Sequence, residues 1–199
     1  MRASFFVATA LLLSACYGGT GVRQTPAIHD LSSAQLENSS GQPGVLRQVE
    51  VHSPSWLDTA AMQYRLSYAD RTRRETYAAS RWAAPPARLL QQKLRQRLLS
   101  GPLPFQADGC RLRVDLDEFV QDYYRPESSQ VVIEARVTLL APRTDTFLAR
   151  QDFRLIQSAG ADARSGVIAL EAAVRRFADE IQHWLAQTGS ETSKPCRVG

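Results

Sequence analysis

The sequence predicts a single α+β domain in which two main helices pack on one face of an antiparallel or mixed sheet. Two segments, at residues 110–117 and 131–139, alternate apolar and polar side chains, as strands with one buried face do. Two others, starting near residues 86 and 163, repeat apolar residues at helical spacing. The first 15 residues have the layout of an export signal, and residues 16–46 show no apolar periodicity. We therefore assign the domain to residues 47–199.

The N-terminus combines one positive charge at Arg2 with a mostly apolar run from Ala3 to Leu13. This run is too short for a membrane span, which needs roughly 20 residues. It closes on Leu13-Ser14-Ala15-Cys16, which resembles a bacterial lipobox, where the chain is cut before the cysteine and lipid is attached to it. We therefore expect residues 1–15 to be a signal peptide and Cys16 the lipid anchor. The alternative is an ordinary signal peptide with Cys16 there by chance.

Residues 16–46 are rich in Gly, Ser and Pro and show no apolar periodicity, so they are predicted to be a flexible tether. Thirty such residues span roughly 30 Å on average and stretch to about 100 Å. Residue 17 is Tyr, whereas in bacterial lipoproteins an Asp there favours the inner membrane. The similarity thus implies sorting to the periplasmic face of the outer membrane.

The first half of the domain is expected to contain three strands and a helix. Residues 47–52, 62–68 and 76–82 alternate in polarity, and the second and third form a hairpin across a turn at 69–72. Pro85 and Pro86 then suit the first turn of a helix that ends before Gly101-Pro102. The apolar face of this helix consists of Ala87, Leu90, Leu94 and Leu98.

The second half is predicted to be a three-stranded meander followed by a long helix. Its strands are residues 110–117, 131–139 and 147–156, with a polar connection at 121–129 between the first two. The helix is expected at about 163–187. Its apolar stripe is Val167, Leu170, Val174, Phe177, Ile181 and Trp184.

The charge pattern argues against nucleic-acid binding. The 199 residues carry 24 basic and 20 acidic side chains, a net charge of +4, and the arginines are interleaved with acids instead of clustered. Cys110 and Cys196 remain besides Cys16, and an exported chain meets an oxidising compartment. A bridge between them would close a loop of about 87 residues and stabilise by roughly 4 kcal/mol, while two free thiols remain the alternative.

The sequence does not predict an enzyme, a cofactor or a metal site. His29, His52 and His183 fall in the tether, at a strand end and on a helix, without a catalytic or metal-binding spacing. Asp115, Asp117 and Glu118 form an acidic cluster that period two most simply places on the solvent face of a strand. The one group expected to be added is the covalent lipid on Cys16.

Several segments together resemble the ABC-type transport auxiliary lipoprotein family, in particular its paraquat-inducible, PqiC-like members. The segments are Ser53-Pro54-Ser55-Trp56-Leu57, Tyr64-Arg65-Leu66-Ser67-Tyr68, Ser80-Arg81-Trp82-Ala83-Ala84-Pro85-Pro86, and the closing helix at 178–185. The resemblance covers about residues 45–187. The tether and the Cys110 and Cys196 pair are not part of the family pattern.

The resemblance implies a non-catalytic lipoprotein that docks to an MCE-domain protein in lipid transport between two membranes, beside an ABC transporter. It also implies homo-oligomeric rings for some members. Aromatic residues and Arg dominate interface energies, so the candidate docking residues are Tyr64, Arg65, Trp82, Tyr123 and Tyr124, although Trp82 and Tyr64 also suit a core. The alternative is an envelope-assembly lipoprotein that binds or activates a cell-wall synthase or an outer-membrane machine.

Overall fold

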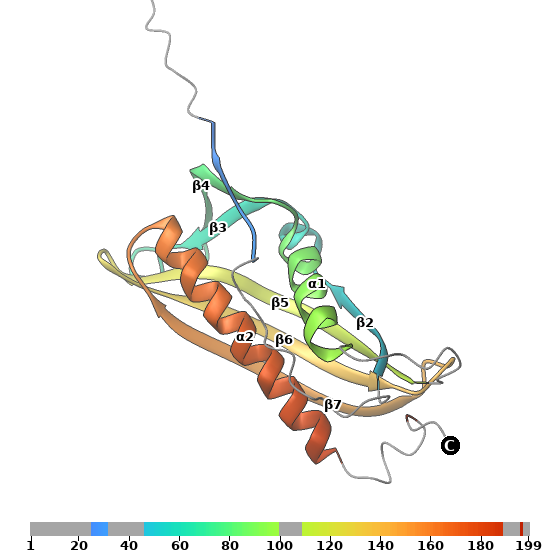
Figure 1. Cartoon of the computed structure of the whole chain (residues 1–199). Helices are drawn as coiled ribbons and strands as arrows, with labels where there is room; N and C mark the ends of the chain where they lie inside the picture. The colour runs from blue at the N-terminus through green and yellow to red at the C-terminus, as the bar shows by residue number, and fades with distance from the viewer. Residues whose placement is uncertain (1–24, 32–45, 100–108, 189–195, 197–199) are drawn as a thin grey trace, which may run out of the picture.

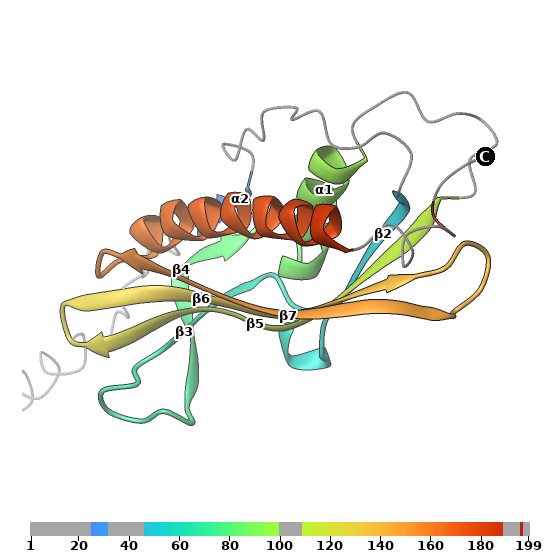
Figure 2. The ribbon, with the colours of Figure 1, turned by 90° about the horizontal axis from the view of Figure 1, so that it is seen from below.

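The computed structural model describes residues 25–31, 46–99, 109–188 and 196. They form one mixed seven-stranded sheet with both long helices on the same face, which confirms the predicted α+β class (Figures 1 and 2). The elements are β1 (Ala27–His29), β2 (Leu46–His52), η1 (Ser55–Leu57), β3 (Ala61–Arg65), β4 (Arg74–Trp82), α1 (Pro86–Leu98), β5 (Cys110–Arg125), β6 (Ser128–Leu140), β7 (Phe147–Ala159) and α2 (Ala163–Gln187).

The sheet is organised around β5. Its strand order is β1-β4-β3-β5-β6-β7, and β2 also pairs with β5. β6 occupies one edge of β5 in antiparallel register, whereas β2 and β3 share the other edge, both parallel, β2 along residues 110–115 and β3 at residues 121–122. Consequently, β2 has a strand neighbour on one side only among the described residues.

The two helices begin where the sequence predicts. α1 starts after Pro85 with Pro86 in its first turn, and it buries Leu90 and Leu94 completely. At the start of α2, the Asp162 carboxylate accepts a hydrogen bond from the backbone N–H of Ser165 at 2.9 Å, which satisfies an otherwise unpaired helix donor. The predicted stripe of α2 is buried on the sheet, with Trp184 at its margin.

Part of the expected tether belongs to the domain. Ala27–His29 pair with Ser80–Trp82 of β4 in parallel register, and the backbone N–H of Ala83 donates to the carbonyl of His29 at 2.7 Å. Leu31, only 1% exposed, joins the main core. Pairing and burial therefore hold this short segment, although its composition predicts flexibility. Leu46, the last residue of the expected tether, begins β2, whereas the signal peptide, Cys16 and residues 17–24 and 32–45 lie outside the described residues.

The predicted polar connection at residues 121–129 is wrong. β5 continues to Arg125 and pairs with β6 as far as Ser128, so only a tight turn joins them. The register shifts between Leu116 and Glu118, which makes Asp117 the extra residue of a β-bulge. Side chains at even positions face the helices before the bulge, and those at odd positions face them after it.

The structure contains the disulfide between Cys110 and Cys196. Both residues are fully buried, and the bridge joins the start of β5 to the chain beyond α2, as expected. Within the described residues, no helix is both long enough and apolar enough to cross a bilayer.

Candidate docking sites

Trp82, one of the expected docking residues, is a core residue. It is 2% exposed, and its ring packs edge-on against Phe119 at a centroid separation of 5.7 Å. It is the last residue of β4 and belongs to the same core cluster as buried residues of α1 and α2, where burial of a large aromatic stabilises the fold. A partner cannot reach it on the folded domain, so the expectation for Trp82 is corrected.

Tyr64 and Tyr123 belong to a partly buried cluster centred on Tyr77. The Tyr77 hydroxyl lies 2.9 Å from Gln121 Oε1 and 2.7 Å from the Tyr123 hydroxyl, and the Tyr64 ring stacks 4.6 Å from that of Tyr77. Burial, and then the hydrogen bond to Tyr123, raise the pKa of Tyr77. Tyr64 donates to Glu75 at 2.9 Å, and this bond is the main cause of its raised pKa. These tyrosines hold β3, β4 and β5 together.

Arg65 contributes to an ion cluster on the sheet face opposite the helices. Its Nη2 lies 2.9 Å from Glu118 Oε2, and both terminal nitrogens of Arg74 contact the same carboxylate at 2.9 and 2.6 Å. The Arg74 guanidinium also stacks over Trp56, 4.0 Å from the ring centroid. Glu118 is 7% exposed, so its predicted place on a solvent face is wrong, because the side chains of Arg65 from β3 and Arg74 from β4 pack against its carboxylate.

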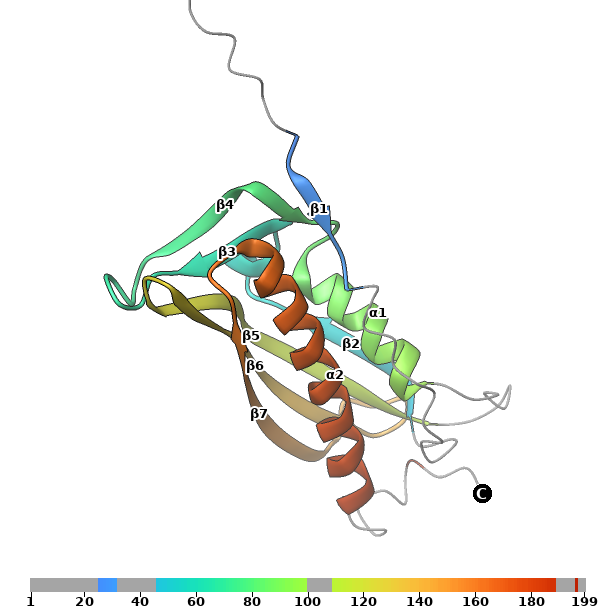
Figure 3. The ribbon, with the colours of Figure 1, turned by 60° about the vertical axis from the view of Figure 1, so that its left-hand side comes forward.

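Tyr124 is the expected docking residue that the fold leaves accessible. It is 47% exposed near the tip of the β5–β6 hairpin, and Tyr68, in the β3–β4 turn, is exposed to the same extent. The backbone N–H of Tyr68 donates to the Tyr123 carbonyl at 3.3 Å, so the two hairpin ends lie side by side (Figure 3). Arg71 and Arg125 are exposed there too. This hairpin-tip surface is one candidate docking site.

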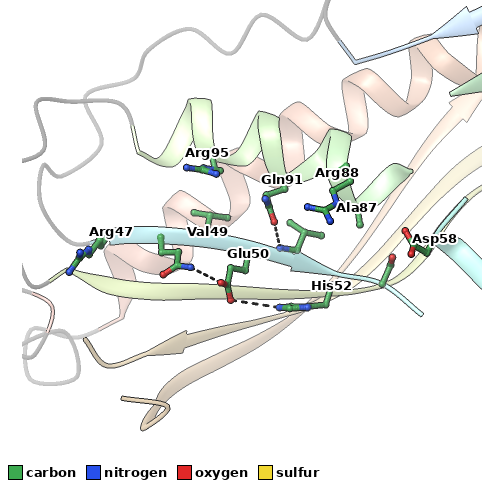
Figure 4. A pocket seen from close by; sticks show the side chains of 12 residues that line it. Arg47, Val49, Glu50, His52, Asp58, Ala87, Arg88, Gln91 and Arg95 are labelled. Atoms are coloured by element: carbon green, nitrogen blue, oxygen red, sulfur yellow. Dashed lines mark hydrogen bonds and ion pairs between the residues drawn. The ribbon is translucent and has the colours of Figure 1, made fainter. Parts of the chain in front are cut away.

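A second candidate, the β2–α1 groove, has a volume of about 610 Å³ and lies between the outer edge of β2 and one side of α1 (Figure 4). The strand contributes residues 47–52, Ser53 follows it, and Asp58 closes one end. On the helix side, the lining consists of Ala87, Arg88, Gln91 and Arg95, at spacings that share one helix face.

The outer edge of β2 exposes backbone groups to this groove. The N–H of Val51 points away from β5 and donates to the side chain of Gln91 at 2.9 Å. Backbone groups alternate in direction along a strand, so those of Val49 face the same way. An edge strand with unpaired groups is a template for another strand. Gln91 satisfies one of them and marks the direction in which an added strand would bind.

The groove is rich in arginine. Arg47, Arg88 and Arg95 are exposed, and none has an ion-pair partner among the described residues. Of the two acids in the lining, Glu50 is engaged by Gln48 and by His52, whose Nε2 lies 3.7 Å away. The lining thus has free positive charge beside free backbone groups, which suits an extended acidic peptide.

The same groove does not have the geometry of a hydrolase. His52 is the last residue of β2, and Ser53 follows it outside the strand. In the part of the chain that the structure describes, no hydrogen bond joins His52 to Ser53 or Asp58, and no cluster of three or more His, Cys, Asp or Glu is placed to hold a metal.

The sequence alone does not predict the β2–α1 groove, because its strand and its helix each have an ordinary local explanation. Arg88, Gln91 and Arg95 are typical of the solvent face of an amphipathic helix. The alternation in residues 47–52 is typical of any strand with one buried face. The available signal was that these three helix positions share one face. That this face borders the free edge of β2 depends on the parallel pairing of β2 with β5, which alternation does not encode.

The sequence of this chain matches a known protein family, and its fold matches solved structures. The sequence pattern of the ABC-type transport auxiliary lipoprotein component matches residues 29–182, which is most of the chain. The chain belongs to this family. As an auxiliary lipoprotein of ABC-type transport, it is membrane-anchored. The match begins at His29, within the ordered segment around β1.

Two solved structures share the fold of this auxiliary lipoprotein. A Xanthomonas campestris protein is 18% identical, with a TM-score of 0.66 over 86% of this chain and 98% of its own. An uncharacterized protein is 17% identical, with a TM-score of 0.60 over 81% of this chain and 99% of its own. No curated protein matches the sequence.

Proposed function

We propose that this chain is the non-catalytic, outer-membrane-anchored subunit of a PqiC-like lipid-transport system, in which it docks to an MCE-domain protein. Cys16 carries the lipid anchor. Of the three cysteines in the sequence, the other two are joined in the disulfide, which leaves Cys16 as the cysteine for lipidation. Tyr17 in place of Asp supports the outer membrane as its location.

The observation that carries the docking proposal is the β2–α1 groove. A partner segment that adds to β2 gains main-chain hydrogen bonds from the strand edge, and its side chains meet the helix face of α1. Arg47, Arg88 and Arg95 select an acidic segment, because opposite charges speed the encounter and like charges are repelled. The partner segment is therefore an extended, acidic stretch of the MCE-domain protein.

The groove is also well placed for a partner that approaches from the periplasm. β1, which follows the N-terminal part of the chain, lies at one end of the domain, whereas β2 lies toward the other (Figure 1). The hairpin-tip surface at Tyr124 lies closer to the β1 end (Figure 3). Docking at the groove would thus leave the membrane-proximal end of the domain free.

The test is site-specific photocrosslinking in cells, with the photoreactive residue at position 88 or 95, followed by mass spectrometry of the captured protein. Position 124 reports on the hairpin-tip surface, and position 152, exposed on β7, is the control. Capture of an MCE-domain protein from 88 or 95, but not from 152, is the expected result. Capture of a cell-wall synthase or an outer-membrane assembly protein instead would favour the envelope-assembly alternative. Capture of further copies of this chain alone would contradict the proposal.

A further inference from the structure

A second hollow, distinct from the β2–α1 groove, lies between β1 and the first turns of α2. It has a volume of about 600 Å³, and its apolar lining includes Ala27, Ile28, Val167 and Ile168. Ile28 is 66% exposed and Ile168 59% exposed. Two large aliphatic side chains that project into solvent around one hollow form an apolar surface that the fold itself does not bury.

Basic side chains flank these two isoleucines. Arg164, exposed in the first turn of α2, lines the hollow, and exposed Arg81 lies opposite Ile28 in the β1–β4 register. Neither arginine has an ion-pair partner in the described part of the chain. The acidic lining residues, Asp30 and Glu171, both interact with other groups of the protein. Exposed apolar side chains bordered by arginine favour binding to an anionic membrane surface, because the apolar groups insert and the arginines attract the headgroups.

The length of chain before β1 places this surface near the bilayer. The first described residue is Thr25, nine residues after Cys16. Nine residues span about 30 Å when fully extended and about 17 Å on average when flexible. α2, with its 25 residues, is about 37 Å long. A domain held by so short a linker keeps its β1 end next to the membrane that holds Cys16.

We propose that Ile28 and Ile168 insert into the surface of the lipid bilayer, with Arg81 and Arg164 at the level of its anionic headgroups. This inference rests on the proposed lipidation of Cys16. This contact fixes the orientation of the anchored domain on the membrane. The hollow at β1 faces the membrane, and the β2–α1 groove is directed away from it.

The experiment uses the full-length lipoprotein reconstituted in vesicles of phosphatidylethanolamine and phosphatidylglycerol. An environment-sensitive fluorophore is attached at Ile168→Cys, and the vesicles carry lipids with a quencher on the acyl chain. The matched control is Phe147→Cys, because Phe147 is 61% exposed and lies at the far end of the sheet, beside the β6–β7 turn. We expect a blue-shifted emission and quenching at position 168, and neither at position 147.

Flotation of the vesicles separates the two proposals. If the protein floats with the vesicles but the label at 168 is not quenched, Cys16 is lipidated and the membrane contact is wrong. If the protein does not float, the anchor fails and the membrane contact fails with it. A blue shift without quenching would show that another protein chain covers the hollow, which also overturns the proposal. Ile28→Asp should abolish the quenching of the label at Ile168→Cys while flotation persists.

Discussion

A Cβ atom added to Gly166 in α2 would lie 1.9 Å from Oε1 of Gln121 in β5. Gln121 is fully buried, and its Nε2 donates to Ser129 Oγ at 2.8 Å and to the Gly160 carbonyl at 2.9 Å. The hydroxyl of Tyr77 approaches its oxygen. The glycine thus allows α2 to lie directly on a polar side chain that joins β5, β6 and the loop before α2.

The first prediction concerns this contact. Gly166→Ala should lower the free energy of unfolding by about 1–3 kcal/mol, the usual cost of overpacking, although Ala is intrinsically the better helix residue. Chemical denaturation of the domain measures this free energy. In a Gln121→Ala background, the same substitution should be neutral or stabilising, because the clashing amide is gone. An equal loss in both backgrounds would show that the contact with Gln121 is not the cause.

Gln121 also shows where prediction from the sequence succeeds and where it stops. The alternation from Cys110 to Leu116 correctly identifies the start of β5 and its buried face. Beyond the bulge at Asp117, the positions that face the helices become Phe119, Gln121 and Tyr123, two of them polar. Their burial depends on partners far along the chain, so residues 121–125 look like a loop in the sequence alone.

The candidate sites show the same limit. Tyr123 and Tyr124 both lie in the segment expected to be a polar connection, yet Tyr124 is 47% exposed and Tyr123 only 7%. Local sequence does not distinguish Tyr124 from Trp82, whose burial depends on core residues far along the chain, Phe119 among them. β1 has three residues and no apolar periodicity, so its pairing with β4 appears only in the structure.

The second prediction tests the ion cluster. Glu118→Gln should destabilise the domain by about 2–3 kcal/mol, because Arg65 and Arg74 would lose their shared counter-ion in a largely buried place. The control is Asp117→Asn on the same strand. Asp117 pairs with Arg136 at 2.8 Å, but both side chains are more than 40% exposed, so its loss should cost under about 1 kcal/mol. Comparable losses in the two variants would contradict the assigned difference in burial.

The third prediction concerns acid stability at the start of α2. Hydrogen bonds from the backbone N–H and hydroxyl of Ser165 lower the pKa of Asp162. With its pKa lower in the folded state, the Asp162 carboxylate stabilises the domain above its unfolded pKa of about 3.9, and this contribution is lost as the pH falls through the folded pKa. Asp162→Ala should cost about 1 kcal/mol at neutral pH.

The control for this effect is Asp162→Asn, which keeps a capping oxygen but does not titrate. Its unfolding free energy should fall less steeply than that of the natural chain between about pH 5 and 2. Thermal unfolding at several pH values measures the difference. Parallel pH profiles for the two chains would show that Asp162 does not contribute to acid stability.

The fourth prediction concerns the disulfide. Cys196→Ser removes a link across a sequence separation of 86 residues and should lower the free energy of unfolding by about 4 kcal/mol. Reducing agent should destabilise the natural chain by a similar amount and leave Cys196→Ser unchanged. Cys110→Ser combined with Cys196→Ser controls for the free thiol. An unchanged midpoint after reduction would contradict this contribution.

The fifth prediction distinguishes the two candidate docking sites by charge. Arg88→Glu combined with Arg95→Glu should weaken binding to the proposed MCE-domain partner about tenfold or more, which corresponds to about 1.4 kcal/mol. The loss should lie mainly in the association rate and shrink as salt is added, because screening weakens exposed charges. Arg71→Glu with Arg125→Glu makes the same change at the hairpin tips, where both side chains are exposed beside Tyr68 and Tyr124. Surface plasmon resonance at several salt concentrations compares the two pairs. If only the hairpin-tip pair weakens binding, Tyr124 marks the docking surface and the groove does not, whereas a loss confined to the α1 pair places the partner along β2.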